Sequence, residues 1–170
     1  SGGFVHLDAD SIETLNTSLA NVATEQFREL DGETLLADLG TQEKAFPAFL
    51  GHGIAIPHVY SERLDFRVCF VGSLREGLEV PGQDEAVTFV FFLLSPSGDT
   101  EGHLATLAEI ARTCHSERRR EQIKRAEAVD DVRPNVKAAV VRHHALARDV
   151  DRVGVVEGAR DPDGAAVATA

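Results

Sequence analysis

The sequence predicts a layered α/β domain, because apolar stretches of strand length alternate with amphipathic stretches of helical spacing. Residues 87–94 are apolar apart from one threonine, a pattern typical of a central strand covered on both faces. Apolar residues at 12, 15, 19 and 22 follow helical spacing and predict a helix with one buried stripe. With 170 residues, 43% of them hydrophobic, the chain is long enough for one core, so we expect one domain followed by a tail.

The N-terminal part predicts one strand and two helices. Residues 5–7 read as a short strand, and residues 8–11 offer several N-caps for the helix that starts near Ile12. A break at residues 27–32 contains the turn-forming pair Asp31-Gly32. A second helix is expected from Glu33 to about Ala45, with buried side chains at Leu35, Leu36 and Leu39.

The most informative stretch is the octet at residues 51–58, which reads Gly-His-Gly-Ile-Ala-Ile-Pro-His. Gly51 and Gly53 favour a tight turn, and residues 54–56 suit a short strand packed on both faces. Pro57 restricts the backbone before it and lacks an N–H, so we expect strand pairing to end there. His58 would then stand at the strand end, where rigid backbone holds the imidazole and another molecule can reach it.

A polar connection is expected at residues 60–65, before the next strand. The apolar stretch at 66–74 predicts that strand, followed by a turn at 75–77. Residues 78–80 are extended in character, and 81–84 form a loop rich in turn residues.

The C-terminal part predicts helices after the central strand. One helix is expected from Thr100 to about Cys114, and Ser116 is expected to cap a charged helix over residues 117–127. Pro134 is expected to begin a last helix that includes Val140. From Arg148 onward the apolar periodicity fades.

Composition excludes several classes of function. The net charge of −11 argues against a nucleic-acid-binding surface, which needs clustered positive charge. No apolar run approaches the roughly 20 residues needed to cross a bilayer, so we expect no direct membrane insertion. The two cysteines, Cys69 and Cys114, lie in apolar patterns and are interpreted as buried thiols. The chain contains no methionine, which predicts that it was trimmed or excised from a longer polypeptide.

The octet resembles the active-site signature of the fructose/mannitol-type (type 2) EIIA domain of the phosphoenolpyruvate-dependent sugar phosphotransferase system, a family that includes nitrogen-regulatory relatives. In that family the histidine after Ala-Ile-Pro accepts a phosphoryl group from HPr and passes it to EIIB, which implies this role for His58. The reference pKa of histidine, about 6.5, leaves the imidazole mostly unprotonated near neutrality, as a nucleophile must be.

The resemblance also implies an architecture and a location. It implies an α/β/α domain at residues 4–145, with a mixed central sheet flanked by helices on both sides. A flexible C-terminal extension is expected at residues 146–170. The protein would be cytoplasmic and would need no metal or organic cofactor, because the phosphoryl donor is a phosphohistidine of another protein.

A second stretch, from Leu94-Ser95-Pro96 to the helix start at residues 103–108, resembles the second signature of the same family. The resemblance implies that His103 lies against the active histidine and donates hydrogen bonds to the phosphoryl oxygens. Partner proteins would dock on an apolar rim around His58, to which Phe49, Ile54 and Tyr60 are expected to contribute.

Three positions depart from the family pattern. Gln42-Glu43 stands where Arg-Glu is usual, Ala48 where threonine is frequent, and Val59 where a small residue is usual. Gln42, Glu43 and Ala48 are still expected to belong to the substrate- and partner-binding residues. Glutamine donates hydrogen bonds but lacks the charged planar fork of arginine, so charge stabilisation at the site is expected to be lower.

Three functions therefore stay open at this point. The first is a phosphocarrier enzyme that uses His58 and His103. The second is an EIIA-like regulatory module attached to, or acting on, a membrane transporter with little or no phosphotransfer. The third is a scaffold or dimerisation domain that kept only the fold. A zinc site built from His52, His58 and His103 is disfavoured, because these residues lack close ligand spacing and no cysteine or acidic residue joins them in a recognisable pattern.

Overall fold

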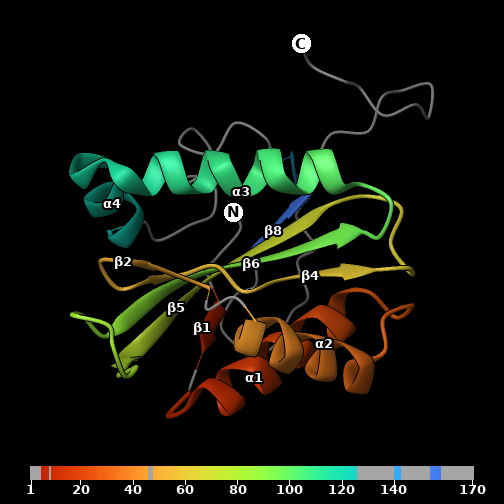
Figure 1. Cartoon of the computed structure of the whole chain (residues 1–170), viewed down its shortest axis with the longest axis horizontal. Helices are drawn as coiled ribbons and strands as arrows, with labels where there is room; N and C mark the ends of the chain where they lie inside the picture. The colour runs from red at the N-terminus through yellow and green to blue at the C-terminus, as the bar shows by residue number, and fades with distance from the viewer. Residues whose placement is uncertain (1–4, 8, 46–47, 126–139, 143–153, 158–170) are drawn as a thin grey trace.

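The computed structural model shows an α/β/α sandwich, which confirms the predicted fold class (Figure 1). It describes residues 5–7, 9–45, 48–125, 140–142 and 154–157. The helices are α1 (Ile12–Gln26), α2 (Gly32–Ala45), α3 (Thr100–His115) and α4 (Glu117–Lys124). The strands are β1 (Val5–Leu7), β2 (Phe49–Gly51), β3 (Ile54–Ala55), β4 (His58–Ser61), β5 (Val68–Leu78), β6 (Val87–Pro96), β7 (Val140–Arg142) and β8 (Gly154–Glu157).

The sheet is mixed and is organised around β6. This strand pairs antiparallel with β5 and parallel with both β3 and β4. On its other edge β5 pairs parallel with β1 and antiparallel with β8, which in turn pairs with β7. The predicted central position of residues 87–94 is therefore confirmed.

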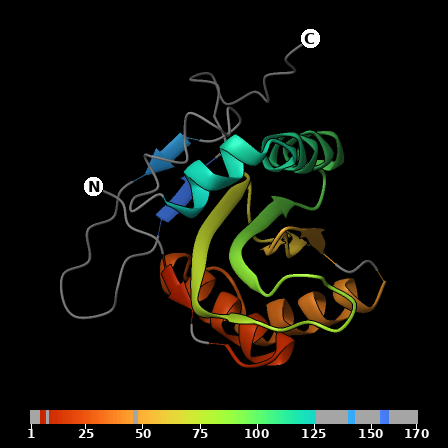
Figure 2. The same cartoon turned by 90° about the vertical axis from the view of Figure 1, so that its left-hand side faces the viewer.

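Alternation along β6 divides the core into two apolar clusters. Val90, Phe92 and Leu94 belong to the cluster that includes the buried leucines of α1 and α2. Phe89, Phe91 and Leu93 belong to a second cluster with residues of α3 and α4. Figures 1 and 2 show the corresponding layers, with α1 and α2 on one side of the sheet and α3 and α4 on the other. Successive side chains of a strand point to opposite faces, so a continuously apolar strand supplies both cores.

Side-chain caps define the starts of three helices. Ser11 caps α1 and forms a capping box with Thr14, so the N-cap lies within the predicted range 8–11. Asp99 caps α3 by accepting a hydrogen bond from the Gly102 N–H. Ser116 caps α4 as predicted. The burial expected within the helices is wrong at Leu36, which is 38% exposed on α2.

Strand β5 runs through the turn that the sequence predicts at residues 75–77. It is one strand from Val68 to Leu78, with a register shift against β6 between Ser73 and Leu78. Gly77 has φ of 72° inside this irregular part. The glycine therefore marks a bulge rather than a chain reversal, because pairing with β6 on both sides of the shift keeps the strand continuous.

Pairing also continues past Pro57, where we expected it to end. The chain resumes as β4, in which His58 pairs with Leu93 of β6. Proline removes only its own N–H, and here the Pro57 carbonyl accepts a hydrogen bond from the Leu93 N–H at 2.9 Å. The residues from 58 to 61 are consequently a strand, and the polar connection is shorter than predicted.

The C-terminal part differs from prediction where the structure describes it. Val140–Arg142 form β7 and not part of a helix, whereas the rest of the helix expected from Pro134 lies outside the described residues. Within the expected flexible extension at 146–170, Gly154–Glu157 form β8 on the edge of β5. Each of the two short strands contains a Val-Val pair, a residue type that favours strands. Pairing of β8 with β5 covers an edge of β5 that would otherwise be open. The boundary at residue 145 stays a prediction.

In the part of the chain that the structure describes, no helix is long and apolar enough to span a membrane.

The hairpin between β2 and β3 immediately precedes the segment that carries His58. Gly51, His52 and Gly53 all have positive φ, of 76°, 55° and 71°. A two-residue hairpin loop with positive φ at both central residues matches the twist of its strands. The Gly53 carbonyl accepts hydrogen bonds from the N–H groups of Thr88 and Phe89, which attaches the hairpin to β6.

We predict that Gly53→Ala destabilises the protein more than Gly51→Ala. Both variants place an L side chain at positive φ, at a cost of about 1 to 2 kcal/mol. A Cβ at residue 53 would also lie 2.7 Å from the Ala86 carbonyl oxygen, whereas residue 51 has open space around it. We expect Gly53→Ala to lower the free energy of unfolding by about 2 kcal/mol more than Gly51→Ala, as measured by urea denaturation. Equal losses in the two variants would show that the close approach to Ala86 is unimportant.

Candidate active site

His58 is the first residue of β4 and is held by a backbone carbonyl. Its Nδ1 lies 2.8 Å from the carbonyl oxygen of Ile56. A carbonyl oxygen can only accept a hydrogen bond, so Nδ1 carries the ring proton and donates it. In neutral His58 the lone pair is therefore on Nε2. That atom lies 3.1 Å from Nε2 of Gln42 on α2, whose amide can donate to it.

His103 lies in the first turn of α3, beside His58. The two ring centroids are 5.3 Å apart, and the His103 residue is only 2% exposed. The Tyr60 ring covers it, with centroids 4.3 Å apart and planes inclined by 30°. His58 and Tyr60 are two residues apart on β4, so both side chains point to the same face of the sheet. The structure thus brings together the two histidines that the sequence singles out.

Burial keeps His103 uncharged. The pKa of its imidazole is lowered from the ordinary 6.5 to about 4. Desolvation by burial is the largest cause, and the neighbouring His58 is the second. The opposing influence of the Asp99 carboxylate, which favours the charged form, is smaller. Near neutral pH, His103 is therefore a neutral imidazole with one ring proton.

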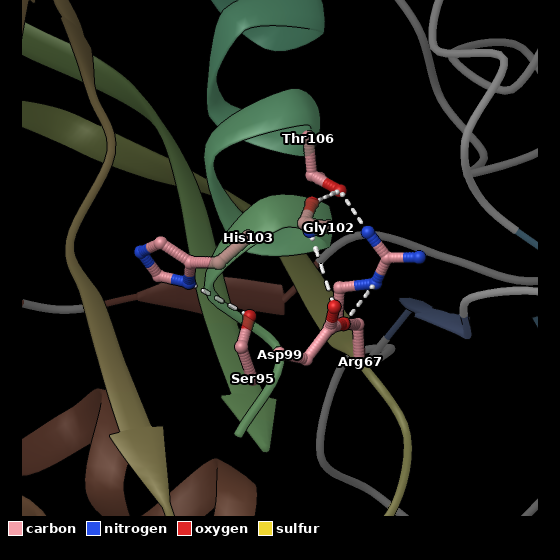
Figure 3. Close-up of polar contacts among 6 residues, drawn as sticks. All are labelled: Arg67, Ser95, Asp99, Gly102, His103 and Thr106. Atoms are coloured by element: carbon pink, nitrogen blue, oxygen red, sulfur yellow. Dashed lines mark hydrogen bonds and ion pairs between the residues drawn. The ribbon is translucent and has the colours of Figure 1, made fainter. Parts of the chain in front are cut away.

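The hydroxyl of Ser95 contacts the other side of the same ring. Ser95 lies near the end of β6 and is fully buried, and its Oγ is 2.8 Å from Nδ1 of His103 (Figure 3). Because Ser95 pairs with Tyr60 across the β4–β6 ladder, the strand register brings the serine and the tyrosine to the same histidine. In the sequence Ser95 is only one position of the second signature, and no local pattern indicates a role for it.

A polar network fixes the first turn of α3, one residue from His103 (Figure 3). Arg67 forms an ion pair with Asp99 at 3.1 Å and donates to the Thr106 hydroxyl at 3.2 Å. Its guanidinium group packs so closely on Gly102 that a Cβ there would overlap it. Figure 3 shows Arg67 and His103 on opposite sides of this turn. Nothing in the local sequence around Arg67 signals this contact, although Asp99 before a helical stretch is a recognisable N-cap.

The predicted partner-binding residues are divided between a crevice, the surface and the core. Gln42, Glu43, Ala48 and Phe49 line an apolar crevice beside His58, together with residues of α1. Tyr60 is 37% exposed and lines a different hollow, which it shares with residues of α2. Ile54 is only 1% exposed and packs in the core under α3, so its expected place on the docking rim is wrong. Both residues of β3 are buried, and Ile54 points to the face of the sheet that α3 and α4 cover.

Glu43 sits next to Gln42 in the same crevice. The Asn16 amide donates to its Oε2 at 3.3 Å. Burial raises the pKa of the Glu43 carboxyl, with the Asn16 hydrogen bond opposing this and the nearby Glu13 adding to it. The pair connects α1 to α2 at the point where Gln42 reaches His58.

The described residues contain no group of three or more His, Cys, Asp or Glu side chains arranged to hold a metal ion. His52, which the zinc alternative required, lies in the hairpin with its Nδ1 3.6 Å from the carboxylate of Glu85. Cys69 and Cys114 are both buried and free, as the sequence predicts.

Comparison with known proteins agrees with this geometry. The profile of the family described as phosphoenolpyruvate-dependent sugar phosphotransferase system, EIIA 2, matches residues 4–138. A nitrogen regulatory protein of Pseudomonas aeruginosa is 31% identical over 108 residues, which are 63% of this chain and 70% of that protein.

Two solved structures share the fold. The crystal structure of nitrogen regulatory protein IIA-Ntr from Neisseria meningitidis has a TM-score of 0.68 at 23% identity, and the match covers 79% of this chain and 92% of that one. The solution structure of the mannitol-specific cryptic phosphotransferase enzyme IIA CmtB from Escherichia coli has a TM-score of 0.58 at 17% identity, with 79% and 91% covered. Because the family profile spans most of the sequence, the chain belongs to the type 2 EIIA family of the phosphoenolpyruvate-dependent sugar phosphotransferase system.

Proposed function

We propose that the protein is a phosphocarrier that accepts a phosphoryl group on Nε2 of His58 from a phosphorylated HPr-like protein and passes it to a cysteine of an EIIB-like protein. The observation that carries this proposal is the hydrogen bond between His58 Nδ1 and the Ile56 carbonyl. It leaves the lone pair on Nε2, the ring nitrogen that faces Gln42, and both residues line the crevice.

Phosphoryl transfer to and from His58 requires no proton movement on its ring. The Nε2 lone pair attacks phosphorus, and the phosphorus–nitrogen bond of the donor phosphohistidine breaks as the donor imidazole leaves with that electron pair. Nδ1 keeps its proton throughout and donates it to the Ile56 carbonyl. In the second step an EIIB thiolate attacks phosphorus, and the bond to Nε2 breaks. Such transfers need positioned groups and neutralisation of the equatorial oxygens.

Gln42 takes part in both states of this cycle. Its amide donates a hydrogen bond to the Nε2 lone pair of His58 and has to move aside before the phosphoryl group enters. Afterwards the same N–H groups can donate to a phosphoryl oxygen. They do so without the positive charge that arginine supplies in the usual family pattern.

A second candidate function is an EIIA-like regulatory module that acts on, or is fused to, a membrane transporter and transfers little or no phosphate. The hydrogen bond from Gln42 to the nucleophilic nitrogen of His58 favours it, because the bond stabilises the unphosphorylated site. The name of the nitrogen regulatory relative from Pseudomonas aeruginosa is consistent with a regulatory role.

We predict that incubation with a phosphorylated HPr-like protein adds one phosphoryl group to the wild-type chain and none to His58→Ala. Intact-mass spectrometry at neutral pH measures the gain. The matched control is His115→Ala, which removes an exposed histidine of α3 and should accept phosphate like the wild type. Failure of the wild type to gain mass from any donor of this class would contradict the phosphocarrier proposal and leave the regulatory one.

We predict that Gln42→Arg speeds phosphoryl transfer. A hydrogen bond from a charged donor is stronger than one from a neutral amide by about 1 kcal/mol, which corresponds to roughly a fivefold to tenfold faster rate. Rapid-quench measurement of phosphorylation with a fixed donor concentration tests this. Gln122→Arg adds the same charge at an exposed position on α4 and should leave the rate near that of the wild type. An equal gain in both variants would mean that only long-range attraction of the donor had improved.

We predict that His103 makes the fold less stable in acid. The folded-state pKa, about 4, lies below the ordinary 6.5, so the unfolded chain binds this proton first. Stability is therefore fully present above about pH 6.5 and is lost as the pH falls toward 4, by roughly 2 to 3 kcal/mol. Urea denaturation at pH 7 and pH 4.5 should show a smaller difference in His103→Gln than in the wild type. His115→Gln is the matched control, and an equal change in both variants would contradict the assignment to His103.

A further inference from the structure

The buried contact between Ser95 and His103 has two possible proton arrangements. The Ser95 Oγ and the His103 Nδ1 are 2.8 Å apart, and each atom is able to donate or accept. In one arrangement the imidazole donates its Nδ1 proton to the hydroxyl. In the other the hydroxyl donates to Nδ1, and the single proton of neutral His103 sits on Nε2. The two arrangements present opposite chemistry to His58.

Burial distinguishes these arrangements. Ser95 has no exposed surface, and within the described residues its hydroxyl meets only His103. If Nδ1 were the donor, the hydroxyl proton of Ser95 would have no acceptor in a place that water does not reach. An unsatisfied buried donor is costly. If the hydroxyl donates instead, its proton is satisfied and only an oxygen lone pair is left without a partner, which proteins tolerate more often.

The other ring nitrogen of His103, Nε2, lies where it can donate a hydrogen bond to a ligand. Figure 3 shows it directed away from Ser95 and from the Arg67–Asp99 pair. In the described part of the chain every fully buried side-chain nitrogen or oxygen has a hydrogen-bond partner. Among the described residues no group bonds Nε2 of His103, so this atom is not fully buried and its N–H can reach water or a ligand. The His58 ring is the neighbouring imidazole, with 5.3 Å between the two ring centroids.

We propose that Ser95 is a positioning residue that fixes His103 in the tautomer with its proton on Nε2, so that His103 presents an N–H to a phosphoryl group carried by His58. The second part of this statement rests on the proposed function. Ser95 does not touch the phosphoryl group itself. It acts through His103, while the Tyr60 ring, tilted by 30° with its centroid 4.3 Å away, packs against the imidazole.

The two histidines would then be opposite tautomers. The Ile56 carbonyl keeps the proton of His58 on Nδ1 and leaves Nε2 as the nucleophile. The Ser95 hydroxyl keeps the proton of His103 on Nε2 and makes it a donor. One backbone acceptor and one side-chain donor thus give neighbouring imidazoles complementary roles, and no ring proton has to move before transfer.

The test is a heteronuclear NMR spectrum that correlates the imidazole nitrogens and carbon-bound protons of isotopically labelled, unphosphorylated protein at neutral pH. Wild-type His103 should show a protonated Nε2 and an unprotonated Nδ1, and His58 should show the reverse. Spectra of His103→Gln and His58→Ala assign the two signals. A proton on Nδ1 of His103 in the wild type would overturn the proposal.

Variants of Ser95 test its part. In Ser95→Ala the signals of His103 should report a mixture of tautomers, and in Ser95→Thr, which keeps the hydroxyl, they should return to the wild-type pattern. Ser97→Ala, which removes an exposed serine two residues further on, should leave the spectrum unchanged. A Ser95→Ala spectrum that is identical to the wild type would show that Ser95 does not set the tautomer.

Phosphorylation rates of the same variants connect the tautomer to function. Ser95→Ala should accept phosphate roughly fivefold more slowly than the wild type, and Ser95→Thr should recover. An unchanged rate in a Ser95→Ala protein with mixed tautomers would refute the link to transfer. Because the spectra need no phosphoryl donor, a wild type that never gains phosphate would sink the proposed function while the tautomer result stands on its own.

Discussion

The pairing of β6 with its neighbours is the constraint on which the rest of the structure depends. This strand is buried on both faces and pairs with β3, β4 and β5. Its parallel pairing continues from β3 across Pro57 into β4 and sets His58 opposite Leu93 and Tyr60 opposite Ser95. The same strand leads through a short turn into α3, whose first turn carries His103. A slip of one residue would turn every side chain of β4 to the other face, so the site exists only in this register.

Within that frame, the immediate neighbours of each histidine are few and rigid. His58 meets a backbone carbonyl, and His103 meets a buried hydroxyl and an aromatic ring. The turn that presents His103 is fixed from behind by the Asp99 cap and by Arg67 lying on Gly102. These groups are in place before any ligand arrives, so little has to be reorganised when a reaction begins. Gln42 is the exception, because its amide occupies the nitrogen that would react.

The sequence predicts the fold well where local pattern decides it and less well where distant pairing does. The continuous apolar run of β6, the spacing in α1 and the caps of α1 and α4 are all local, and they are confirmed. The two histidines come from signature motifs, since 45 positions of chain separate them and periodicity cannot show that their rings meet. Ser95 and Arg67 carry no local signal, because their importance depends on which residue the folded sheet places opposite them. The same reason explains the errors at Pro57, at residues 75–77 and at Val140, where pairing with another strand overrides a breaker or a helical pattern.

The charges around His58 affect which kind of partner protein the site could use on the proposed function. Gln42 is neutral, burial keeps His103 neutral near pH 7, and Arg67 lies on the far side of the α3 turn in an ion pair with Asp99. On the proposed function, a phosphoryl dianion on His58 would therefore be met by neutral hydrogen-bond donors in a chain of net charge −11. Neutral donors hold an anion less strongly than charged ones, so the phosphoryl group would be easily passed on and poorly retained. The missing positive charge would then have to come from the protein docked against the crevice. On the proposed function, transfer would thus depend on formation of a complex with a partner that brings positive charge to the site.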